Sequence, residues 1–227
     1  MQYKHGLVAL AAALSLGSAQ ALDVVNVGAF TLTYDETSDL GWLSGWYTSA
    51  GWQGFNWSIP QSVQVASLNG APATATFDLP SFQLTANPGW TLTGNVAGFL
   101  GNLVYNLVGA TAAASASVSG SLSVNGGPAL PVGGTLTQTA TAGAPGVFEV
   151  GFFSGSQSGD IGPFSSLVFS GGTLTLNAAG GSFAAVTAQP QNQMKIDIAV
   201  AEVPEPAALG LMLGGLAVLA LRKRQSV

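Results

Sequence analysis

The sequence predicts an all-β fold: a single antiparallel β-sandwich, jelly-roll-like, preceded by a signal peptide and followed by one C-terminal transmembrane helix. Three features of the 227-residue chain predict it. Apolar residues alternate with Ser and Thr along most of its length, as they do in half-buried strands. The 31 Gly and 11 Pro cluster into turn signals between these segments. Apolar runs of another kind, without alternation, stand at the two ends of the chain.

A Thr-Leu-Thr motif marks four of the expected strands. It occurs at residues 31–33, 91–93, 135–137 and 173–175, and each copy places Leu on one face between two polar neighbours. The spacing between copies is irregular, so no solenoid is predicted. Residues 23–33 form the first β-rich segment, and further strands are expected at residues 62–68, 74–84, 103–124 with an internal bend, 147–153, 165–169, 182–188 and 195–200.

Turn signals separate these segments. Each contains Gly, Pro or Asn, which accept positive φ or preset a turn. They lie at Asn69-Gly70, 87–89, 125–128, 131–134, 144–146 and Gly171-Gly172. An alternative for residues 109–141 is a loosely ordered segment, because its Ala, Ser and Gly side chains bury little area per residue.

The N-terminal segment predicts export. Lys4 lies in a short polar region, residues 6–16 are apolar, and Ala19 and Ala21 supply the small side chains that a signal peptidase recognises. We therefore expect a secretory signal peptide over residues 1–21. The exported β-sandwich domain would follow at 22–202.

The other end of the chain, residues 203–227, predicts a membrane anchor. Val203-Pro204-Glu205-Pro206 leads into the uncharged apolar run 207–221, which stops at Arg222-Lys223-Arg224. The three cations stay on the cytoplasmic side, because moving each into hydrocarbon costs roughly 2.5 to 3.5 kcal/mol. The 15 apolar residues make a helix of about 22 Å, against a hydrocarbon core of about 30 Å, so the anchor is short.

This tail resembles the PEP-CTERM sorting signal of Gram-negative bacteria, in which Pro-Glu-Pro, one hydrophobic helix and a basic end occur in this order. The resemblance implies that an exosortase recognises Pro204, Glu205 and Pro206 and cuts close to them. It also implies transient anchoring in the inner membrane, followed by transfer to the cell surface or extracellular matrix. The alternative is a plain anchor whose prolines only mark the helix boundary.

Charge and composition limit the chemistry of the body. Between residues 22 and 203 the chain has nine acidic residues and one basic residue, Lys195, giving a net charge of about −8. This sign disfavours nucleic acid as a partner. There is no Cys, and the only His, His5, lies in the signal peptide, so we expect no catalytic triad, no zinc site and no cofactor. A Ser-Lys mechanism could use only Lys195, which a solvated strand face explains more simply.

Carboxylate chemistry stays open. A glycosidase needs only two suitably placed acids. The candidates are Asp35, Glu36, Asp39, Asp78, Glu149 and Asp160, and no spacing singles out a pair among them. The first three could also ligate Ca²⁺, although an acidic turn accounts for them without a metal, and we predict no metal site.

Four of the five Trp, namely Trp42, Trp46, Trp52 and Trp57, lie within residues 41–58. Exposed rings would form a platform that stacks on sugars. Buried rings would instead close one end of the sandwich, and we favour this interpretation because Trp and Phe contribute strongly to burial in a domain without disulfides. The expected function is a non-enzymatic exported surface or biofilm-matrix protein associated with exopolysaccharide. The alternatives are a polysaccharide-binding module and a carboxylate glycosidase.

Overall fold

The computed structural model describes residues 22–40, 42–132, 138–143, 148–190 and 192–203. The predicted signal peptide, the sorting motif and the anchor helix 207–221 lie outside the described residues. Within them the chain is all-β, with 74% of the residues in strands and no helix. Nowhere in this described part is there a helix with the length and hydropathy that a membrane span requires.

The described residues form thirteen strands, and every pairing between them is antiparallel. Their bounds are β1 Asp23–Asn26, β2 Phe30–Tyr34, β3 Leu43–Ser49, β4 Trp52–Ser58, β5 Gln64–Asp78, β6 Phe82–Ala86, β7 Trp90–Val108, β8 Ala113–Val124, β9 Leu130–Val132, β10 Gln138–Thr141, β11 Phe148–Asp160, β12 Ser166–Thr187 and β13 Gln193–Glu202. The all-β antiparallel prediction is therefore confirmed.

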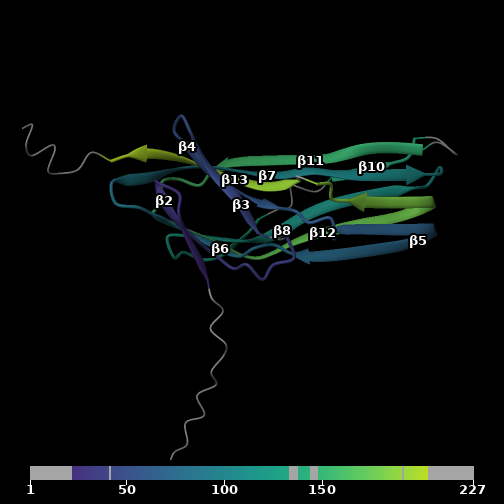
Figure 1. Ribbon diagram of the computed structural model, residues 1–227, viewed down its shortest axis with the longest axis horizontal. Coiled ribbons are helices and arrows are strands. Elements are labelled where there is room, and N and C mark those ends of the chain that lie inside the picture. Colours follow the sequence, from purple (N-terminus) through teal and green to yellow (C-terminus); the bar gives the residue numbers. More distant parts are fainter. Residues whose placement is uncertain (1–21, 41, 133–137, 144–147, 191, 204–227) are drawn as a thin grey trace, which may run out of the picture.

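The strands belong to one continuous sheet, with the order β1-β2-β6-β12-β7-β13-β4-β3 along its main path. In the simplest β-sandwich, the two layers are two separate sheets. Instead β12 joins the two halves. It pairs with β6 and β8 along its first part, with β7 over residues 183–187, and with β5 from residue 173 to residue 187. Figure 1 shows β7, β11 and β13 along one side of the elongated molecule and β5, β6 and β12 along the other.

The change of direction in β5 and β12 depends on four residues with positive φ. Asn69 and Gly70 have φ of 52° and 79°, and Gly180 and Gly181, opposite them, have φ of 72° and 63°. Both strands turn back there at one end of the molecule (Figure 1). Glycine is required at 180, because a Cβ would lie 1.9 Å from the Thr111 carbonyl oxygen. The Asn69-Gly70 turn signal was thus interpreted correctly, but hydrogen bonding to β12 continues through it.

The core lies between the two halves of the sheet. Leu32, Leu92 and Leu174 are the central residues of three Thr-Leu-Thr motifs, and all three are fully buried, as predicted. The fourth copy, at 135–137, is outside the described residues. The predicted bend within 103–124 is confirmed at Gly109, whose carbonyl accepts a hydrogen bond from Ala112 N–H (3.0 Å) between β7 and β8.

The loosely ordered alternative for residues 109–141 is wrong where the structure describes them. β8 pairs with β12 on one side and with β9 and β10 on the other. Its Ala114, Ala116 and Val118 alternate into the core with Ser115 and Ser117 between them. A strand with small side chains is ordered here because the neighbouring strands hydrogen-bond to its main chain on both sides and help to bury its side chains.

Candidate functional site

The hairpin of β3 and β4 carries most of the tryptophans. β3 is at the edge of the sheet, and the turn at Ala50-Gly51, with Gly51 at φ 79°, pairs Ser49 with Trp52. Because side chains alternate faces along a strand, register decides where each ring points. The structure therefore separates residues that are close neighbours in sequence.

Trp57 belongs to the core and not to a binding surface. It is 0% exposed, as is Phe55, and the two rings meet edge to face with centroids 4.9 Å apart. Tyr34 and Phe82 pack on Trp57 at 6.2 and 5.4 Å, and Phe30 packs on Phe55 at 6.1 Å. The stacking role considered for Trp57 is wrong, and the interpretation that rings close one end of the sandwich holds for this residue.

Trp42 and Trp46 are exposed at the edge of the sheet, by 64% and 54% of their surface. Trp46 is the register partner of Phe55, so it lies on the core side of the sheet but beyond the covered part. The main-chain carbonyl of Trp42 accepts a hydrogen bond from Ser58 N–H (3.1 Å), which fixes the start of the hairpin. These two rings offer apolar faces to solvent at an unpaired edge.

Trp52 points to the opposite face. Its partners in register are Ser49 and Ala199, and it shares its face of β4 with Gly54 and Asn56, whereas Phe55 and Trp57 share the other. Its exposed fraction is 36%. The four tryptophans thus do not form one platform: Trp57 is core, Trp46 is exposed on the core side of β3, Trp42 is exposed just before β3 begins, and Trp52 lies on the outer face.

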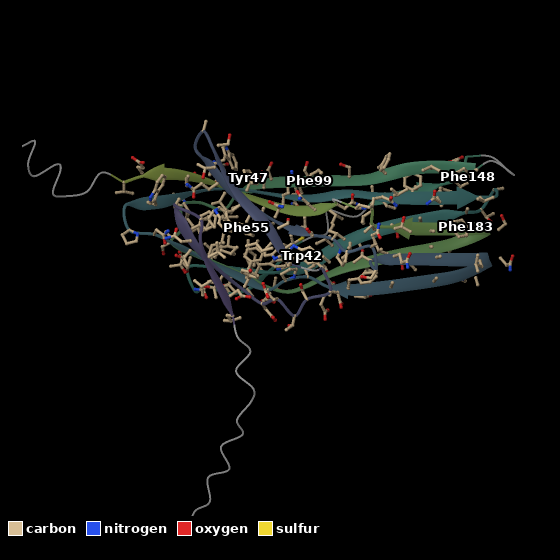
Figure 2. All side chains as sticks on the ribbon, viewed as in Figure 1. Trp42, Tyr47, Phe55, Phe99, Phe148 and Phe183 are labelled. Atoms are coloured by element: carbon tan, nitrogen blue, oxygen red, sulfur yellow. The ribbon has the colours of Figure 1, made fainter. Side chains whose placement is uncertain are left out.

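The outer face of the same region holds a group of residues that sequence reasoning did not bring together. Figure 2 shows Tyr47 and Phe99 near one another on this part of the molecule, while Phe55 lies inside it. The Tyr47 hydroxyl donates a hydrogen bond to Asp197 Oδ1. Burial, together with this bond, raises the pKa of Tyr47 above its ordinary value. Lys195 and Asp197 are two residues apart on β13. The sequence alone predicts only a solvated face for Lys195 and does not single out Asp197, because the hydrogen bond from Tyr47 to Asp197 spans 150 residues.

The acidic turn before the hairpin does not gather its carboxylates at one point. Asp35 accepts hydrogen bonds from Thr37 N–H (2.9 Å) and its hydroxyl (2.7 Å), which hold the pKa of this carboxyl below its usual value. Glu36 accepts one from the Tyr34 hydroxyl (3.2 Å), and Asp39 accepts one from Asp78 N–H (2.8 Å). Each carboxylate has a local structural partner.

An apolar cleft of about 400 Å³ opens between the two halves of the sheet. Its lining includes Val96 and Leu100 of β7, Ile196 of β13, and Leu167 and Phe169 of β12. None of the six carboxylates considered for glycoside hydrolysis lines this cleft, and none lines a second hollow, on the outer face, to which Tyr47, Phe99 and Lys195 contribute.

Two further carboxylates from that set also accept hydrogen bonds from the main chain: Glu149 from Gly143 N–H (2.6 Å) and Asp160 from Gly162 N–H (2.9 Å).

The structure also disfavours a catalytic Ser-Lys pair. Ser156 and Lys195 stand on either side of Phe99 in register, which separates their Cα atoms by two strand spacings, about 9.5 Å.

The predicted processing sites lie outside the described residues. These are the signal-peptidase positions Ala19 and Ala21, the sorting residues Pro204, Glu205 and Pro206, and the basic end Arg222, Lys223 and Arg224. The structure does show what precedes the sorting residues. β13 ends at Glu202, and Val203 N–H donates to the Gly89 carbonyl (2.8 Å). Val203 is thus the last residue of the body that the structure describes, and Pro204 follows it in the sequence.

Solved structures similar to the chain cover most of it at low identity. The enzymatically active domain of bacteriophage CBA120 tailspike protein 4 matches 75% of this chain (13% identity, TM-score 0.20), and the match covers 19% of that domain's solved chain. TmCBM61 in complex with β-1,4-galactotriose matches 83% of this chain and 90% of its own (11% identity, TM-score 0.17). The structure of infectious bursal disease virus, Gx strain, matches 87% of this chain and 55% of the viral chain (12% identity, TM-score 0.19). Likenesses with TM-scores this low carry no argument about function.

No curated protein sequence matches the chain closely enough to count as a relative. A family match does exist for the tail: the PEP-CTERM protein-sorting motif matches residues 202–225. The match covers Pro204, Glu205 and Pro206, the apolar run, and the cations up to Arg224. The chain thus carries a PEP-CTERM sorting motif directly behind its β-sheet body, and this motif implies an exported protein that an exosortase sorts.

Proposed function

We propose that the protein is a non-enzymatic component of the cell surface or extracellular matrix, held briefly in the inner membrane, cut near Pro204–Pro206 and associated with exopolysaccharide. The PEP-CTERM motif at 202–225 is the observation that carries this proposal. The short apolar run supports a temporary anchor, because it spans the hydrocarbon core only with thinning or with snorkelling of its basic residues.

The junction between body and tail supports cutting without unfolding. Glu202 is the last strand residue, and Val203 is the last residue with a main-chain hydrogen bond to the body that the structure describes. Pro206 biases Glu205 towards an extended backbone, the form in which a protease cleft binds a substrate. An exosortase could therefore reach the motif while the sheet stays intact.

Association with polysaccharide rests on the exposed rings at the edge of the sheet. Trp42 and Trp46 expose more than half of their surface at the edge strand β3, which is unusual for residues of this size. Aromatic faces of this kind stack on the C–H faces of sugars. The absence of Cys and His from residues 22–203, and the structural roles of the carboxylates described above, support a non-enzymatic role.

Processing is tested by replacing both prolines. In Pro204→Ala/Pro206→Ala, we expect the full-length chain to accumulate in the membrane fraction, whereas the wild type is shortened and found outside the cell. Immunoblotting of membrane and culture-fluid fractions measures this, with Pro190→Ala as a matched control outside the motif. Unchanged processing of the double variant would remove the sorting interpretation.

Polysaccharide association is tested by pull-down on the native exopolysaccharide. We expect Trp42→Ala/Trp46→Ala to lose most of its retention. Phe148→Ala serves as control, because Phe148 is a similarly exposed ring (61%) on β11, away from the hairpin. Equal retention of the wild type and the double variant would contradict a stacking role for the edge tryptophans.

A further inference from the structure

The outer face of the sheet presents a groove of about 310 Å³, lined by Tyr47, Ala97, Gly98, Phe99, Ser156, Lys195 and Asp197. Register places most of these residues in two adjacent rows that cross neighbouring strands. One row runs Ser156, Phe99, Lys195, Asn56, and the next runs Ser158, Ala97, Asp197, Gly54, Tyr47. The groove is therefore built on five paired strands and not on loops.

The shape of the groove comes from alternating large and small residues. Phe99 in one row and Tyr47 in the other carry its rings, while Ala97 and Gly98 are its small lining residues. The Tyr47 side chain reaches from β3 across β4, since a Cβ on Gly54 would lie 2.7 Å from Tyr47 Cζ. Glycine at position 54 is thus what allows this ring to lie over the strand and reach Asp197. Figure 2 shows Tyr47 and Phe99 close together on this surface.

The polar groups of the groove supply both donors and acceptors. Asp197 is oriented by the Tyr47 hydroxyl, which occupies one of its oxygens and leaves further acceptor sites. Lys195, the only cation between residues 22 and 203, forms no ion pair with any described residue. Ser156 adds a hydroxyl on the far side of Phe99.

These features together select a ligand class. Ring faces beside a mixed set of hydroxyl, carboxylate and ammonium groups suit a sugar, which offers C–H faces and many hydroxyls. An anionic ligand is disfavoured, because Asp197 lies in the groove and the body carries about −8. A purely apolar ligand would leave the Asp197 and Lys195 charges without water or partner.

We infer that this groove binds a neutral saccharide, with Phe99 and Tyr47 against its ring faces and Asp197 and Lys195 bonded to its hydroxyls. The inference rests on the proposed association with polysaccharide and adds a second contact surface, on the opposite side of the sheet from Trp46. A polysaccharide strand held at both places would be bound more tightly than at either alone.

The test is calorimetric titration of the full chain, kept in a polyoxyethylene detergent that contains no sugar. The probes are cellohexaose, maltohexaose and mannohexaose, with trigalacturonate as the acidic counterpart. We expect at least one neutral probe to bind, and Phe99→Ala and Tyr47→Ala each to weaken it about tenfold. Tyr47→Phe should retain most of the affinity, since it keeps the ring. Phe148→Ala should change nothing, as this exposed ring lies outside the groove.

Three results would overturn the inference: no binding of any neutral probe at millimolar concentration, binding that Phe99→Ala and Tyr47→Ala leave unchanged, or tighter binding of trigalacturonate. If Tyr47→Ala fails to fold, as its circular dichroism would reveal, Phe99→Ala and Asp197→Asn carry the same test. Retention on native exopolysaccharide separates the two proposals. Loss in Trp42→Ala/Trp46→Ala but not in Phe99→Ala would leave the edge platform standing and remove the groove.

Discussion

The two ends of the sheet bury their cores in different ways. Where β2, β4 and β6 meet, Phe30, Phe55, Trp57 and Phe82 fill the interior with mutually packed rings. Along β8 and the facing part of β12, the buried positions are held largely by Ala114, Ala116 and Ala178, with Val and Leu between them. At the aromatic end, β2 and β6 alternate buried and less buried residues as β8 does. β4 is buried from Gln53 to Trp57, so the two regions differ both in side-chain volume and in how far the outer face is covered.

The difference shows that strand pairing and core volume are separate sources of order. An aromatic side chain buries 150 to 250 Å², several times what an alanine methyl can. The aromatic end is therefore expected to supply a large share of the burial energy in a domain without disulfides. The alanine region depends more on its hydrogen-bonded neighbours and on the close approach of strands that small residues permit.

The largest effect should follow from truncating the aromatic core. Trp57→Ala removes a fully buried ring with three aromatic neighbours, and we expect a loss of about 3 to 5 kcal/mol in the free energy of unfolding. Chemical denaturation measures it. Trp46→Ala, on the same hairpin but 54% exposed, should cost less than about 1 kcal/mol. Similar losses in both variants would contradict the division of the tryptophans.

A smaller loss of stability is expected in the alanine region, caused by adding volume to the core and not by removing it. Ala116→Leu inserts three carbons at a position that is 1% exposed, and overpacking should cost about 1 to 3 kcal/mol. Ser117→Leu is the matched control, because the neighbouring side chain points to the other face of β8. If Ala116→Leu proved neutral in denaturation, the strands would not be as closely packed there as the structure shows.

The smallest effect concerns pH at the aromatic end. Burial, aided by the hydrogen bond to Glu36, raises the pKa of Tyr34 from 10.0 to about 12. The folded state thus favours the neutral phenol. This contribution to stability is complete below pH 10 and is lost as pH rises through about 12. We expect the unfolding free energy of the wild type to fall more steeply in this window than that of Tyr34→Phe. Parallel pH curves from denaturant titrations would speak against this role for Tyr34.

Much of the fold was predictable because alternation and turn residues are local signals. Three buried leucines of the Thr-Leu-Thr motifs, the turn at Asn69-Gly70 and a bend somewhere within 103–124 follow from them. The joining of two halves into one sheet was not, because the long-range pairing of β12 with β7 leaves no mark in a short window.

The same limit applied to the candidate surfaces. Alternation places Trp52 and Trp57 on opposite faces of one strand, but which face is covered depends on β2 and β6. The groove was missed for a related reason: Tyr47 meets Asp197 only through the pairing of β3 with β4 and of β4 with β13. The sorting motif needed no tertiary structure, since a processing enzyme reads it as a linear segment.

The central claim is that a folded sheet is exported and then separated from a tail made to be removed. Mass spectrometry of the protein recovered from the cell exterior tests it most directly, because one measurement fixes both termini. We predict a chain that begins at Leu22, ends near Pro204–Pro206 and lacks Arg222, Lys223 and Arg224. Recovery of only the intact chain, with the basic residues still attached, would contradict the account.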